Sequence, residues 1–123
     1  MIRMEIVEKR IHKTYMIQTD AYVVIKNSSY IPGQLVSIGK GGITFLYIEN
    51  GEPINGRFNV DVFSSSDTYC LKGMPLKVIS DVKEDDEQPS IHGNIRRCIG
   101  QFDELKQIQA IQLDYFINNY TDQ

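Results

Sequence analysis

The sequence predicts a mainly β fold: about six short antiparallel strands, arranged as a small barrel or a sandwich, followed by one C-terminal helix. Three observations predict this fold. Strand-like segments separated by glycine- and asparagine-rich turns run from residue 21 to about residue 102. Residues Phe58–Val62 alternate apolar and polar side chains, as a half-buried antiparallel strand does. After Phe102 the spacing of apolar residues becomes helical.

The chain has 123 residues, which is the size of one domain. Hydrophobic residues make up 41% and charged residues 24%, values typical of a globular protein. No apolar run approaches the ~18 residues of a transmembrane helix, and the N-terminus lacks the apolar core of a secretion signal. We therefore expect a cytoplasmic protein without a membrane span, whose core needs no disulfide or metal.

The first strands are predicted on both sides of a glycine-rich corner. Residues Ala21–Ile25 are mostly β-branched or aromatic, and a turn composition follows them. Gln34–Ile38 and Ile43–Ile48 have the same character, and Gly39–Gly42 lies between them. We expect the last two glycines of this corner to supply positive φ angles.

The next strand also predicts which side chains form the core. Two Asn-Gly dipeptides, at positions 50–51 and 55–56, favour tight turns before it. Its polar residues Asn59 and Asp61 share one face, which we expect to meet solvent. The predicted core residues are Phe58, Val60, Val62, Ile43 and Phe45.

Two more strands complete the β region. Residues Tyr69–Val82 favour strand on both sides of Pro75, which cannot donate to a ladder and therefore indicates a sheet edge or a bulge. The acidic run Glu84–Glu87 is expected to be a solvated loop. Residues His92–Phe102 form the last predicted strand.

The predicted helix runs from near Asp103 to near Asn118. Asp103 is a good N-cap, and Glu104 in the first turn suits the helix dipole. We expect the Phe116–Tyr120 end to join the core. The predicted stripe contains Leu105, Ile108, Gln112, Tyr115, Phe116 and Asn119.

The sequence lacks the spacing of common catalytic and metal sites. Five residues rather than four separate Gly33 from the glycine-lysine pair at 39–40, and Gly41 stands where a phosphate-binding loop has Ser or Thr. Neither a GxSxG nor an HExxH motif occurs. Cys70 and Cys98 are far apart and are expected to be small buried hydrophobes. We expect neither an enzyme nor a metal or cofactor.

The charge distribution argues against a dedicated nucleic-acid-binding protein. The net charge is −3 and the sequence pI is about 5.3, whereas duplex binders are normally basic. An OB-like barrel that binds single-stranded nucleic acid would use basic and aromatic residues on one sheet face, and Tyr22 and Tyr47 are the aromatic candidates. One basic cluster stands out near the N-terminus: Lys9, Arg10, His12 and Lys13.

Three segments together are similar to one known family. Glu8–Tyr15 is basic and ends in an aromatic residue, Val36–Ile43 contains the glycine-rich corner, and Arg96–Phe102 leads directly into a helix. This layout resembles PilZ domains, bacterial receptors for cyclic di-GMP, over residues 8–120. The resemblance implies a six-stranded antiparallel β-barrel with a flanking C-terminal helix.

The resemblance also divides the single domain into parts. Residues 1–17 form a basic N-terminal segment, residues 18–102 the barrel, and residues 103–120 the helix.

Arg96 and Arg97 alternate across the last strand, so we expect at least one to face solvent without a special partner.

The ligand motifs of PilZ domains are RxxxR and (D/N)xSxxG. Placing Tyr15 at the aromatic position that follows the first motif puts Arg10 on its first arginine and Thr14 on the second. In the second motif Ser37 replaces Asp or Asn and Gly39 replaces serine, whereas the final glycine is kept. Two of the five motif positions therefore match.

Two functions follow from the resemblance. We favour a non-enzymatic signalling or adaptor domain that acts through a protein partner, with weak or lost cyclic di-GMP binding. The alternative is a functional cyclic di-GMP receptor that uses the N-terminal basic segment and the Ser37–Gly42 corner. In a shifted register, Lys9 and Lys13 would replace the arginine pair. A homodimer through the helix or a sheet edge is also expected. The candidate ligand-binding residues are Lys9, Arg10, Lys13, Thr14, Ser37, Gly39, Gly41 and Gly42.

Overall fold

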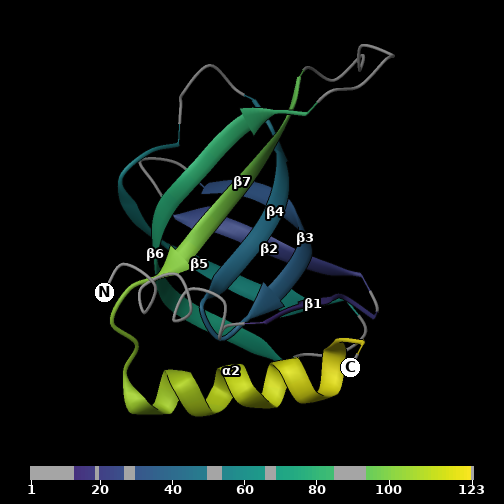
Figure 1. Ribbon diagram of the computed structural model, residues 1–123, viewed down its shortest axis with the longest axis vertical. Coiled ribbons are helices and arrows are strands. Elements are labelled where there is room, and N and C mark those ends of the chain that lie inside the picture. The colour runs from purple at the N-terminus through teal and green to yellow at the C-terminus, as the bar shows by residue number, and fades with distance from the viewer. Residues whose placement is uncertain are drawn as a thin grey trace, which may run out of the picture.

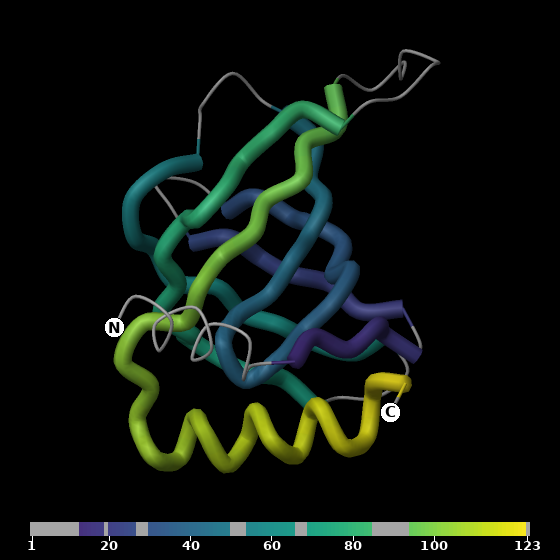
Figure 2. Tube along the Cα trace, in the orientation of Figure 1, coloured from purple at the N-terminus to yellow at the C-terminus, as the bar shows by residue number. Residues whose placement is uncertain are grey.

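The computed structural model describes residues 13–18, 20–26, 30–49, 54–65, 69–84 and 94–122. These residues form seven strands and one helix (Figures 1 and 2). The elements are β1 (Thr14–Met16), β2 (Ala21–Lys26), β3 (Tyr30–Gly39), β4 (Gly42–Ile48), β5 (Arg57–Ser64), β6 (Cys70–Lys83), β7 (Ile95–Phe102) and α2 (Gln107–Tyr120).

Six of the strands close into an antiparallel barrel. They pair in the order β3-β2-β5-β6-β7-β4, and β4 pairs back onto β3. The short β1 is an outside strand that pairs with the second half of β3, with Thr14 opposite Gly39. Helix α2 lies across one end of the barrel (Figure 1). The predicted class, a mainly β six-stranded antiparallel barrel with a C-terminal helix, is confirmed.

The barrel interior contains the side chains that the alternation of β5 predicts. All five predicted core residues are buried, and even the most exposed of them, Phe58, is only 8% exposed. The interior is tight enough that a Cβ at Gly100 would collide with the side chain of Leu76. Close packing of this kind stabilises the barrel because apolar surface is removed from water.

The irregularity predicted near Pro75 is a β-bulge. Lys72 and Gly73 of β6 together lie opposite the single residue Asp61 of β5. Gly73 has a φ of 61°, and its N–H donates to Asp61 Oδ1 at 2.8 Å. Pro75 itself remains paired with Asn59.

Helix α2 begins at Gln107, later than predicted, because Asp103 has other partners. The Asp103 carboxylate accepts from the Glu104 N–H at 3.0 Å and pairs with Arg57 Nε at 3.2 Å. The N-cap is Lys106, whose N–H donates to Gln109 Oε1 at 3.0 Å. The N-cap prediction at Asp103 was therefore wrong.

The face of α2 that packs on the barrel also differs from the predicted stripe. Ile108 and Tyr115 of that stripe are exposed, as is Ile111. The prediction that the Phe116–Tyr120 end joins the core is confirmed. Tyr69, just before β6, packs against Tyr115 in a tilted arrangement with ring centroids 4.7 Å apart, and its hydroxyl donates to the Gln112 carbonyl at 3.0 Å. The buried residues of α2 are Leu113, Phe116, Ile117 and Tyr120.

Candidate ligand site on the outer face of the barrel

Strand alternation places the described candidate residues on the outer face of the barrel. Ile38 of β3 is fully buried, so its neighbours Ser37 and Gly39 point outward. β1 runs beside them on one side, with Met16 opposite Ser37. On the other side Ser37 lies opposite Thr44 of β4. Ser37 and Gly39 therefore lie on the outer face of the barrel, beside β1.

A cavity of about 350 Å³ opens on this face beside the β3–β4 corner. Four candidate residues line it: Lys13, Thr14, Gly41 and Gly42. The rest of its wall comes from β4, β6 and β7, and consists of Ile43, Thr44, Ile79, Ile99, Gly100 and Gln101. Aliphatic side chains thus make up much of the cavity wall, and the charged residue in this wall is Lys13.

Two other candidate residues, Ser37 and Gly39, do not line this cavity. Ser37 is 9% exposed, and a Cβ at Gly39 would collide with the carbonyl of Lys13. A serine at position 39, which the family motif has, would therefore require β1 to move. Lys9 and Arg10 lie outside the described residues.

The glycines of the corner have a different role from the one predicted. Among the described glycines, those with positive φ are Gly56 and Gly73, so the expectation for Gly41 and Gly42 was wrong. Gly42 is required by close approach instead, because a Cβ there would collide with the carbonyl of Gly100 on β7.

All three arginines within the described ranges form ion pairs with carboxylates. Arg57 pairs with Asp103, as described above. The Arg97 guanidinium forms two hydrogen bonds with Glu84, at 2.8 and 2.9 Å. This contact raises the pKa of Arg97 and lowers the pKa of Glu84. The expectation that Arg96 or Arg97 would lack a special partner was wrong.

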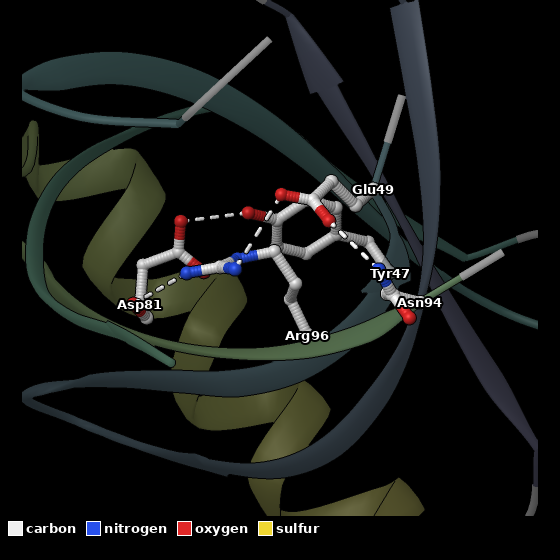
Figure 3. Close-up of polar contacts among 5 residues, drawn as sticks. All are labelled: Tyr47, Glu49, Asp81, Asn94 and Arg96. Atoms are coloured by element: carbon white, nitrogen blue, oxygen red, sulfur yellow. Dashed lines mark hydrogen bonds and ion pairs between the residues drawn. The ribbon is translucent and has the colours of Figure 1, made fainter. Parts of the chain in front are cut away.

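Arg96 belongs to a polar cluster at one end of the barrel (Figure 3). Its Nε donates to Asp81 Oδ1 at 3.1 Å, and its Nη1 lies 3.5 Å from Glu49 Oε1. Tyr47 donates from its hydroxyl to Asp81 Oδ2 at 2.7 Å, and Asn94 donates to Glu49 at 3.4 Å. Burial and the Asp81 carboxylate raise the pKa of Tyr47. Because Tyr47 is buried, it cannot serve the aromatic sheet face of the nucleic-acid alternative.

The cysteines and the acidic residues give no metal centre in the part of the chain that the structure describes. Cys98 is fully buried, and burial raises the pKa of its thiol to about 12. Cys70 is half-buried, and burial again raises its pKa. Both thiols are free.

The described helix is also too short to cross a membrane.

Sequence reasoning missed five residues of the cavity wall: Thr44, Ile79, Ile99, Gly100 and Gln101. It also missed Lys77, which lies opposite Gln101. Alternation along β7 could have identified Ile99 and Gln101, because the buried Cys98 and Gly100 point inward. Ile79 could not be found in this way, since it is the extra residue of a bulge between Val78 and Ser80.

Comparison with known proteins supports the fold. None of the protein-family models matches the sequence, and no curated protein matches it. Among solved structures, the PilZ domain of YcgR from Escherichia coli with c-di-GMP is 15% identical, with a TM-score of 0.69 over 87% of each chain. YcgR from Escherichia coli in complex with c-di-GMP is 16% identical, with a TM-score of 0.64 over 87% of this chain and 43% of that one. The barrel and helix therefore have the PilZ fold.

Proposed function

We propose that this chain is a non-enzymatic PilZ-like signalling domain that acts through a protein partner and binds cyclic di-GMP weakly or not at all. Two observations support a signalling domain: the shared fold, and the complexes of both structural neighbours with c-di-GMP. The departures of this chain from the family's ligand motifs support the loss of the ligand.

The observation that carries the proposal is the lack of an available guanidinium at the cavity among the described residues. Arginine suits cyclic di-GMP because its planar fork binds phosphate or a guanine edge through two hydrogen bonds. Thr14, which the predicted motif placement aligns with the second arginine, lines the cavity. The cation that lines the cavity among the described residues is Lys13, which offers a point charge without the fork.

The size of the expected loss follows from the missing contacts. A hydrogen bond to a charged group contributes roughly 1.5–3 kcal/mol. Losing two such bonds would weaken binding by about two to four powers of ten. The outward Ser37 cannot supply a carboxylate or amide, and Gly39 has no hydroxyl.

The alternative, a functional receptor, has its own support. Lys13, Gly41 and Gly42 line one cavity, so an amine and close backbone approach are available together. Lys9 and Arg10 would add charge from the preceding segment. Binding by such groups would be salt-sensitive and poorly selective for guanine.

Titration calorimetry of the full chain with cyclic di-GMP, with GTP as the control ligand, tests the proposal. We expect no saturable heat below about 100 μM, a limit set by a loss of two or more powers of ten from micromolar affinity. Saturable low-micromolar binding that prefers cyclic di-GMP and disappears in Arg10→Ala would overturn the proposal.

A second arm of the experiment tests the placement of the motifs. Thr14→Arg combined with Ser37→Asp should create or strengthen cyclic di-GMP binding, whereas Thr14→Gln with Ser37→Asp should not, because it lacks the guanidinium. Gly39→Ser is left out of the combination because its Cβ would collide with Lys13. If the arginine variant behaves like the glutamine variant, the motif placement is wrong.

A further inference from the structure

The aliphatic wall of the cavity continues into an exposed apolar surface on β4, β6 and β7. Ile48, Ile79, Val82 and Ile99 are between 41% and 56% exposed. Their strands are neighbours: β4 pairs with β7, and β7 pairs with β6. Single exposed aliphatic residues are ordinary, but a set on adjacent strands that also borders a cavity is typical of an interaction surface. We call this surface, with the cavity, the apolar face.

The charges around the apolar face are cationic. Lys13 lines the cavity, and Lys77 lies opposite Gln101, another cavity residue. Both lysines are exposed, and neither forms an ion pair with a carboxylate of the described residues. Arg97, which also points outward on β7, is neutralised by Glu84. Among the described residues, the unpaired charges beside this face are thus positive, although the chain as a whole carries a net charge of −3.

We propose that the apolar face binds a segment of a partner protein that presents aliphatic side chains flanked by carboxylates, such as an acidic amphipathic helix. Ile79 and Ile99 would receive the aliphatic side chains. Lys13 and Lys77 would face the carboxylates from different sides of the cavity. This inference rests on the proposed function, for which it names the surface and the chemistry of the partner.

The same observations disfavour other occupants. The bases of a nucleotide bind best by stacking on aromatic rings or guanidinium groups. The cavity wall has aliphatic side chains instead, and the guanidinium of Arg97 is paired with Glu84. A second copy using the same face would bring two sets of lysines into one interface, where like charges repel. Charge complementarity therefore favours an acidic protein segment.

A synthetic amphipathic helix with a leucine stripe and flanking glutamates is the probe. A matched peptide carries lysine in place of each glutamate. Both are titrated into the ¹⁵N-labelled full chain, and amide shifts are followed by NMR. We expect the acidic peptide to shift the amides of Ile79, Ile99 and Gln101, and the lysine peptide to bind at least tenfold more weakly.

Matched variants of the chain separate charge from packing. Lys77→Glu should raise the Kd of the acidic peptide about two- to fivefold, the range for an exposed charge pair. Lys72→Glu makes the same change on the same strand, away from the cavity, and should leave the Kd unchanged. Ile99→Ser should weaken binding, whereas Ile111→Ser on the exposed side of α2 should not.

Three results would overturn the inference: equal affinity for the two peptides, shifts confined to α2, or equally tight Lys77-dependent binding to phosphatidylglycerol vesicles. These results are distinguishable from failure of the proposed function. Cyclic di-GMP binding in the calorimetric test would refute the proposed function, whereas the peptide titration addresses the apolar face without any nucleotide.

Discussion

The hydroxyl of Tyr47 donates a 2.7 Å hydrogen bond to one carboxylate oxygen of Asp81, and Arg96 donates to the other oxygen at 3.1 Å (Figure 3). These residues come from β4, β6 and β7, so the contacts join three adjacent strands at one end of the barrel. The Asp81 side chain is only 12% exposed. A carboxylate this buried needs partners, because an unpaired buried charge is strongly destabilising.

Tyr47→Phe should lower the free energy of unfolding by about 1–3 kcal/mol, because it removes a hydrogen bond to a charged group without changing the volume of the ring. Urea unfolding followed by circular dichroism measures this loss. Tyr30→Phe is the matched control, since Tyr30 is exposed, and should change stability by less than ~0.5 kcal/mol. Equal stability of the two variants would show that the Asp81 contact contributes nothing.

Gly42→Ala should be more destabilising than Gly56→Ala, and the two variants separate steric from torsional effects. At Gly42 the new Cβ would collide with the backbone carbonyl of Gly100, which cannot move without disturbing the β4–β7 ladder. Gly56 has open space around it but a φ of 72°, so alanine there costs only the left-handed strain of about 1–2 kcal/mol. The urea concentrations at the midpoints of unfolding show which of the two variants is less stable. The reverse order would refute the close approach of β4 and β7.

The buried thiol of Cys98 predicts a loss of stability in alkaline solution. Its pKa is raised by burial to about 12 in the folded chain and is near 8.5 in an unfolded one. The neutral thiol therefore stabilises the fold fully below about pH 8.5, and this contribution is lost as the pH rises toward 12.

Cys98→Ala should make the stability of the chain less dependent on pH. By pH 10.5 the unsubstituted chain should lose roughly 2–3 kcal/mol more than the variant, relative to pH 7, at about 1.36 kcal/mol per pH unit. Urea unfolding under reducing conditions at the two pH values measures the difference. Tyr47 is present in both chains, so its own titration cancels. Parallel pH profiles would contradict the burial of the thiol.

The barrel could be predicted because its strands carry local signals. Alternation along Phe58–Val62 identified the buried face of β5, and that face then fixed its partners on the neighbouring strands. The glycine-rich corner likewise identified the β3–β4 connection. Turn residues and a two-residue alternation of apolar and polar side chains can be recognised in the sequence without knowing the tertiary contacts.

The remaining features depend on contacts between residues far apart in the sequence. Asp103 has the local properties of an N-cap, but its carboxylate is held by Arg57 of β5. Arg97 pairs with Glu84, the residue that follows β6, and the register of β6 on β7 is shifted by the bulge at Ile79. Tyr69 packs against α2 and helps to fix which face of the helix is buried. No periodicity in the sequence contains this information.

Helix α2 gives the last prediction, which tests the observed orientation of its faces. Phe116 is fully buried between Tyr69 and Tyr120, with ring centroids 6.4 and 5.0 Å away, whereas Ile111 is exposed. Phe116→Ala should therefore cost about 3–5 kcal/mol, because it leaves a cavity where the helix meets the barrel. Ile111→Ala should change stability by less than ~0.5 kcal/mol, because alanine favours helix and no buried contact is lost. Urea unfolding of both variants measures the difference. A larger loss for Ile111→Ala would mean that the helix packs through its other face, or that this face is buried against a second copy, which light scattering at two protein concentrations would reveal.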